Sequence, residues 1–202
     1  MTTLDLGFLA SHGGSSMRAI VGAIAGDGLD ARARIVIGNN GDAPALQFAH
    51  AQGIPVRHIS AKTEGSEPAA DQAICRAFED SGVAWVVMSG YLRKLGPATL
   101  ARYRGRILNI HPALLPKFGG QGMYGRRVHE AVLAAGEHVS GATIHLVDEE
   151  YDHGRIIAQR EVPVLPGDTV DDLQQRVMAA EPGFFVDVLR SLASGGALPN
   201  PA

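Results

Sequence analysis

An asparagine and a histidine stand two positions apart at the end of an apolar run, in the segment RILNIHPALLPKFGG (106–120). Residues two apart in a strand project to the same side, so Asn109 and His111 can face one site. An asparagine amide can donate a hydrogen bond to an oxyanion, and an imidazole can donate a proton. The pair therefore predicts stabilisation of a tetrahedral intermediate. A histidine that serves only the local structure is the alternative interpretation.

Serine and cysteine nucleophiles are not indicated. No G-x-S-x-G turn lies near the Asn/His pair, which argues against a covalent hydrolase. The lone cysteine, Cys75, can form neither an internal disulfide nor a thiolate metal cluster, so we expect no metal. A single cysteine fits a reducing compartment, and the N-terminus MTTLDLGFLASHGGSS lacks the basic region of a signal peptide. We therefore expect a cytoplasmic protein with no membrane partner.

A glycine- and serine-rich turn, SHGGSS (11–16), follows the first apolar run and precedes a helical pattern. Glycines allow close backbone approach, and the free N–H groups of a helix start attract anions. The turn matches neither GxGxxG nor GxxxxGK[ST], so a simple monophosphate is a better ligand than a dinucleotide or nucleoside triphosphate. A tight turn with a serine cap is the alternative.

Composition limits the architecture and the partners. The chain has 202 residues with 46% hydrophobic content, enough for one sizeable core, so we expect a single domain over 1–202. A formal net charge of -3 lacks the basic excess that binding to nucleic-acid backbones requires.

Short apolar runs alternate with helical patterns, which predicts an α/β fold with a Rossmann-like, mostly parallel sheet and flanking helices. The order changes after residue 138, where two adjacent strands predict an antiparallel edge. The expected strands are 4–9, 33–38, 54–59, 84–89, 106–110, 139–148 and 154–164, and the expected helices are 16–26, 43–52, 69–82, 97–103, 126–136 and 169–193.

Several motifs, in this order, resemble the formyltetrahydrofolate-dependent formyltransferases. They are SHGGSS, SGYLRKLGP (89–97), LNIHPALLPK (108–117), SGATIHLVDEEYDHG (140–154) and RVMAAE (176–181), and GGQGMYGRRVHEAV (119–132) resembles a variant of the family's corresponding segment. The resemblance covers nearly the whole chain. It implies a one-carbon transferase that uses 10-formyltetrahydrofolate as co-substrate, and it is strongest to the branch that formylates glycinamide ribonucleotide in purine biosynthesis.

The resemblance implies that Asn109, His111 and Asp152 form the catalytic centre, with the Asp152 carboxylate raising the pKa of the histidine. From the residue types alone, a turn residue between two strands is the preferred interpretation of Asp152, because aspartate is common in turns. His145 lies on the preceding predicted strand, either supporting the site or serving the structure. The chemistry agrees with the family role, because a nearby carboxylate favours the imidazolium that would stabilise an oxyanion.

The resemblance also implies where the two substrates bind. The acceptor phosphate would lie at Gly14, Ser15 and Ser16, and the acceptor would also contact Glu181. The folate would contact the segment Leu92, Arg93, Lys94 and Leu95 together with Asn109, Val147 and Asp148. Solvent-exposed charged side chains are the alternative for Glu181, Arg93 and Lys94.

Two departures from the family pattern affect these expectations. Glu67 stands about where an arginine-bearing loop is expected, and Arg126 or Arg127 could substitute for that arginine. Pro182 follows Glu181 and should bend or interrupt the long C-terminal helix.

The alternatives are a formyltransferase of the same fold acting on another small amine or on methionyl-tRNA, a formyltetrahydrofolate hydrolase, or a non-catalytic phosphosugar-binding module. The expected partners are a small phosphorylated amine and a folate. We expect no nucleic-acid partner, and we expect the protein to be a monomer or a homodimer.

Overall fold

A single seven-stranded sheet organises the computed structural model, which describes residues 3–195. The strand order is β3-β2-β1-β4-β5-β6-β7, and all neighbouring pairs up to β5 are parallel. β6 pairs antiparallel with both β5 and β7. The expected mostly parallel sheet with an antiparallel edge is therefore confirmed. The strands are β1 (Leu4–Ala10), β2 (Ala31–Gly38), β3 (Val56–His58), β4 (Trp85–Met88), β5 (Ile107–His111), β6 (Val139–Leu146) and β7 (Ile156–Pro163).

Six of the helices lie where the hydrophobic pattern predicted them. They are α1 (Ser15–Ala25), α2 (Pro44–Ala51), α4 (Glu67–Asp80), α5 (Pro97–Arg102), α6 (Arg126–Ala134) and α7 (Val170–Ala193). The short helix α3 (Ala61–Glu64) was not predicted, because four residues are too few to show a helical period. Within the described residues, no helix has the length and apolar character to cross a membrane.

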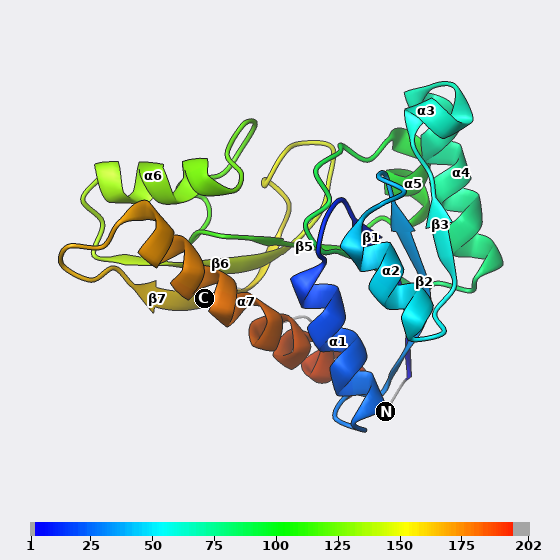
Figure 1. Ribbon diagram of the computed structural model, residues 1–202, viewed down its shortest axis with the longest axis horizontal. Coiled ribbons are helices and arrows are strands. Elements are labelled where there is room, and N and C mark those ends of the chain that lie inside the picture. The colour runs from blue at the N-terminus through cyan, green and yellow to red at the C-terminus, as the bar shows by residue number, and fades with distance from the viewer. Residues whose placement is uncertain (1–2, 196–202) are drawn as a thin grey trace.

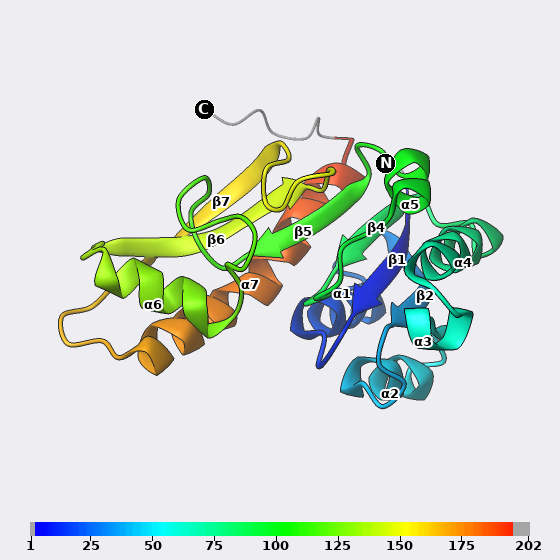
Figure 2. The same cartoon turned by 90° about the horizontal axis from the view of Figure 1, so that it is seen from above.

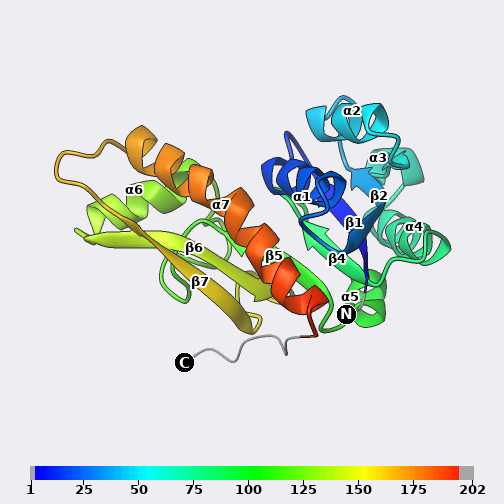
Figure 3. The same ribbon diagram turned by 90° about the horizontal axis from the view of Figure 1, so that it is seen from below.

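Helices cover both faces of the sheet (Figures 1, 2 and 3). Alternation along β1 explains how one strand serves both layers: Phe8 joins the core formed with α1 and α7, whereas Leu9 joins the core formed with α4. A third, smaller cluster lies between α6, β7 and the start of α7. The antiparallel strands β6 and β7 therefore extend the sheet beyond the parallel half, with α6 and α3 near opposite ends of the molecule (Figure 1).

Of the two effects expected of Pro182, a bend or an interruption of the last helix, the interruption does not occur, because α7 runs continuously from Val170 to Ala193. Proline removes one backbone hydrogen bond, but tertiary packing holds the helix on both sides of it. Val177 and Phe185 are both fully buried in the clusters that α7 covers. In addition, the Arg160 guanidinium lies 4.8 Å from the centre of the Phe184 ring.

Candidate active site

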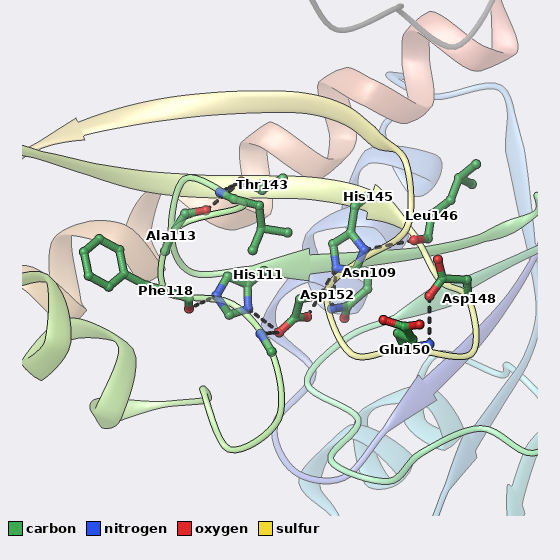
Figure 4. Close-up of polar contacts among 12 residues, drawn as sticks. Asn109, His111, Ala113, Phe118, Thr143, His145, Leu146, Asp148, Glu150 and Asp152 are labelled. Atoms are coloured by element: carbon green, nitrogen blue, oxygen red, sulfur yellow. Dashed lines mark hydrogen bonds and ion pairs between the residues drawn. The ribbon is translucent and has the colours of Figure 1, made fainter.

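The central pair lies at the carboxyl end of β5, the last strand of the parallel run. β5 ends at His111, and its antiparallel pairing with β6 places Asn109 opposite His145 and His111 opposite Thr143. This is the edge of an open α/β sheet where ligand sites form. Figure 4 shows that Asp152, from the loop between β6 and β7, reaches the same place. The structure thus brings the three predicted catalytic side chains together.

His111 lies between two hydrogen-bond acceptors and is only 3% exposed. Its Nε2 donates to the Phe118 carbonyl at 2.8 Å, and its Nδ1 lies 3.3 Å from Oδ2 of Asp152. Because a carbonyl and a carboxylate both accept, only the doubly protonated imidazolium satisfies both contacts. The geometry therefore suits a charged ring.

Asp152 raises the pKa of His111, as predicted, but it does not decide the net shift. Burial lowers the pKa of His111 below its ordinary value, and this effect exceeds the opposing effects of the Asp152 charge and the Phe118 carbonyl. Asp152 acts in the predicted direction, but removing the ring from water disfavours its charged form more. An anion in the site would add to the effect of Asp152 and favour the imidazolium.

Asp152 is held from several directions in an unusual backbone conformation. Its φ is 55°, in the left-handed region, which aspartate tolerates better than most residues. Its Oδ2 accepts a hydrogen bond from the Gly120 N–H at 3.1 Å. Burial acts to raise the pKa of Asp152, but the contacts of its carboxylate with the His145 and His111 rings and with the Gly120 N–H outweigh it, so the net shift is downward. The carboxylate is therefore kept ionised.

Gly119 has a steric reason to lack a side chain. A Cβ atom there would lie 2.4 Å from Cδ2 of Leu115 and 3.2 Å from Cβ of Asp152. The first of these distances is too short for two carbon atoms, so a side chain at this position would displace the side chain of Leu115.

His145 joins the two sides of the site, which resolves the alternatives that the sequence left open for it. Its Nδ1 donates to the Leu146 carbonyl at 2.9 Å. Its Nε2 lies 3.1 Å from Nδ2 of Asn109 and 3.5 Å from Oδ1 of Asp152. The imidazole is thus placed to orient both the amide and the carboxylate.

A buried hydroxyl holds the loop that leaves β5. Oγ1 of Thr143 donates to the Ala113 carbonyl at 2.6 Å and accepts from the Leu115 N–H at 3.0 Å. Nε2 of Gln159 also donates to the Leu115 carbonyl, at 2.9 Å. These bonds fix the loop against β6, and the chain then continues to the Phe118 carbonyl that contacts His111.

Sequence reasoning missed two contributors to the site, Phe118 and Gly120, and one buried histidine, His129. Phe118 and Gly120 act through backbone atoms, which have no side-chain signature in a sequence. His129, on α6, is 1% exposed, and its Nδ1 has no hydrogen-bond partner in the described part of the chain. Burial and the neighbouring His111 lower its pKa. Its position between Val128 and Val132 on the apolar side of α6 was the one available signal, and it indicates a buried ring rather than a role.

The predicted phosphate turn has open backbone donors. Gly14 precedes α1 with a φ of 63°, a conformation that favours glycine, and no side chain caps the helix start. The N–H groups of Ser15 and Ser16 point away from the helix because the first turn has no intrahelical acceptors. The next N–H, of Met17, is taken by Oγ of Ser89 at 3.0 Å. Two adjacent donors at a positive helix end suit an anionic oxygen.

Glu181 lies on α7, partly covered, and burial raises its pKa to about 7. Within residues 3–195, no hydrogen bond or ion pair joins it to the catalytic network. A cationic or hydroxyl-bearing ligand would supply the missing partner.

The two predicted folate-contacting segments lie next to each other. Leu95 is buried in the cluster against which Val147 also packs. Nζ of Lys94 lies 5.6 Å from the centre of the Tyr151 ring, one residue before Asp152. Leu92 is 54% exposed while its N–H donates to Oγ of Ser11 at 2.8 Å. A flat heterocycle could therefore pack against apolar walls and meet exposed backbone groups.

Asp148 and the two arginines of the variant segment, Arg126 and Arg127, each contact neighbouring groups of the protein. Oδ1 of Asp148 accepts from the Glu150 N–H at 2.9 Å, within a tight turn. Arg126 pairs with Glu130 and Asp171, and Arg127 lies over the Tyr124 ring. Because α6 lies far from α4, which begins at Glu67, these arginines do not take the place of a cation near Glu67, and a contact from them to the ligand stays a prediction (Figure 1).

Comparison with known proteins shows which family this chain resembles. The formyl transferase family model matches residues 6–189. The chloroplastic phosphoribosylglycinamide formyltransferase of Arabidopsis thaliana is 38% identical over 188 residues, which cover 93% of this chain and 64% of that protein. The phosphoribosylglycinamide formyltransferase of Escherichia coli (strain K12) is 33% identical, with 95% of this chain and 88% of that protein covered.

A solved structure agrees with the fold. The crystal structure of glycinamide ribonucleotide transformylase 1 from Symbiobacterium toebii superposes with a TM-score of 0.88 at 34% identity, covering 96% of this chain and 89% of that chain. The chain spans less than two thirds of the length of the Arabidopsis relative, but most of the length of the bacterial ones. On this sequence match and this shared architecture, the chain belongs to the formyl transferase family.

Proposed function

We propose that this protein transfers the formyl group of 10-formyltetrahydrofolate to the amine of glycinamide ribonucleotide, a step of purine biosynthesis. The observation that carries the proposal is the convergence of Asn109, His111 and Asp152, linked by His145, at the end of β5. The names of the relatives from Arabidopsis thaliana and Escherichia coli support the choice of substrates.

In this proposal the enzyme stabilises charge and places the reacting groups. The uncharged amine attacks the formyl carbon, and the carbonyl oxygen becomes an oxyanion. The Asn109 amide donates to that oxygen, and His111 turns from its present acceptors to donate to it as an imidazolium. The new C–N bond forms first, and the tetrahedral intermediate then collapses with cleavage of the bond from the carbon to N10 of the folate. One proton passes from the amine to N10, with Asp152 and water as carriers.

The binding roles follow the placement of the remaining residues. The N–H groups at Gly14, Ser15 and Ser16 would hold the phosphate, and Glu181 would pair with the amine or the hydroxyls of the acceptor. Leu95 and Val147 offer apolar walls for the pterin, beside the backbone of the segment 92–95 and the Asp148 turn. A cytoplasmic location, a single domain and a monomeric or dimeric state remain predictions.

The test follows folate deformylation spectroscopically with the full chain, 10-formyltetrahydrofolate and glycinamide ribonucleotide. We expect turnover that requires the amine. Equal turnover without the amine would contradict the proposal and indicate a hydrolase. Folate binding without turnover would also contradict it, and would indicate another acceptor or a binding module.

A further inference from the structure

A cavity of about 1030 Å³ has a lining that does not include Asn109, His111 or Asp152. Its walls come from the carboxyl ends of β2 and β3, from α3 and α4, and from the segment after β4. The segment from Tyr91 to Leu95 forms one wall and includes residues that we assign to the folate. The cavity is therefore continuous with the proposed folate site.

Cations and anions are balanced in this cavity. Its lining includes Lys62, Arg93 and Lys94 as cations and Asp42, Glu67 and Asp71 as anions. The Asp71 carboxylate is occupied, since it accepts from the Ala98 and Thr99 N–H groups at 2.8 and 3.2 Å. Asp42 and Glu67 are exposed and lie in no ion pair of the described chain. The cavity can thus bind carboxylates, but it is not a strongly basic channel.

The part of the proposed folate site at Val147 and Asp148 is acidic rather than balanced in charge. A cavity of about 150 Å³ there is lined by Asp148, Glu149 and Glu150, with Arg104 and His153 as the basic groups. A folate has a neutral pterin at one end and a glutamyl group, with its carboxylates, at the other. The acidic side disfavours the glutamyl end, so charge directs that end toward Lys62 and Arg93.

With the glutamyl end directed into the larger cavity, and resting on the proposed function, we propose that Glu67 makes the protein select folates with short glutamyl tails. Each added glutamyl residue brings one more carboxylate into a cavity that already has as many anionic as cationic side chains. Glu67 stands at the start of α4, in the wall that faces Tyr91 and Arg93. A longer tail therefore gains repulsion without a new cation.

The pKa of Tyr91 supports this placement of Glu67. Burial raises the pKa of Tyr91 to about 12, with the Glu67 charge adding to the rise and the Arg93 charge opposing it. The pKa of the Tyr91 phenol therefore depends on the charges of both Glu67 and Arg93. Glu67 and Arg93 consequently act on the same part of the cavity.

The experiment compares tetrahydrofolate with one and with three glutamyl residues. Binding to the full chain is measured by calorimetry, and KM is measured with the corresponding 10-formyl compounds. We expect the wild type to bind the triglutamate no more tightly than the monoglutamate. Glu67→Arg changes the local charge by two, so it should improve triglutamate binding about fivefold more than monoglutamate binding, with Glu67→Gln intermediate. The difference should shrink in 0.5 M salt, roughly as screening predicts.

Glu64→Arg is the matched control, because Glu64 is exposed on α3 and does not line the cavity. It should leave the ratio of the two affinities unchanged. The inference is overturned if the wild type already prefers the triglutamate by about tenfold, or if Glu67→Arg changes both affinities equally. Absence of formyl transfer would instead overturn the proposed function, while the binding ratio would still test the role of Glu67.

Discussion

The Nε2 atom of His145 lies 3.1 Å from the amide nitrogen of Asn109, across the β5–β6 pair. The same atom lies 3.5 Å from Oδ1 of Asp152 (Figure 4). One imidazole therefore fixes the orientation of an amide and of a carboxylate that come from separate parts of the chain. We expect it to act as a positioning residue, since it reaches the reacting atoms only through these neighbours.

Replacing His145 by alanine should lower kcat by about 10- to 100-fold with little change in KM, because small misplacements of catalytic groups are costly. His145→Gln should recover part of the rate by restoring a hydrogen bond to Asn109. Steady-state kinetics with both substrates would check this. Equal loss in the two variants, or a loss confined to KM, would contradict a positioning role.

Replacing His111 by alanine should lower kcat by at least about a hundredfold, since the site would lose its proton donor. His50→Ala is a matched control, because His50 is exposed on α2. Single-turnover rates at saturating substrate would separate chemistry from binding. A near-normal rate for His111→Ala would remove this residue from the mechanism.

Asp152→Asn tests the electrostatic link to His111. Asparagine tolerates the left-handed conformation at this position, so the fold should be preserved. The pKa of His111, followed by NMR titration of its ring, should fall further in this variant, because the carboxylate charge opposes the effect of burial in the wild type. An unchanged or higher pKa would contradict the proposed link.

Phe185→Ala tests the packing of α7 against the sheet. Phe185 is fully buried, so the substitution should lower the free energy of unfolding by about 3–5 kcal/mol in urea titrations. Met178→Ala on the same helix is the control. Met178 is 48% exposed and should change stability by less than about 0.5 kcal/mol. A loss below about 1 kcal/mol for Phe185→Ala would show that the helix can be repacked.

Asp168 should contribute to stability in a defined range of pH. Both of its oxygens accept from Arg176, at 2.6 and 2.7 Å, and these bonds lower the pKa of Asp168 from 3.8 to about 2. A lowered pKa in the folded state means that its contribution is full above about pH 4 and is lost as the pH falls toward about 2. Urea midpoints measured at pH 5, 3.5 and 2.5 should therefore fall less in Asp168→Asn than in the wild type. An equal fall of the urea midpoint with pH in Asp168→Asn and in the wild type would contradict this contribution of Asp168 to stability.

Strand and helix order could be predicted from the sequence because they follow from local properties. The alternation of apolar runs, the change of order after residue 138 and the spacing of Asn109 and His111 each depend on neighbours in the chain. The motif order also indicated the family, and Asp152 could be assigned a role only by that resemblance.

Tertiary structure decided what depends on distant contacts. Burial outweighs the predicted effect of Asp152 on the pKa of His111, packing of Val177 and Phe185 keeps α7 continuous through Pro182, and the fold separates Arg126 from Glu67. The Phe118 carbonyl and the Gly120 N–H enter the site as backbone groups, which every sequence position possesses. Local residue types thus determined which groups could react, whereas desolvation and long-range contacts decided their charge, their orientation and their partners.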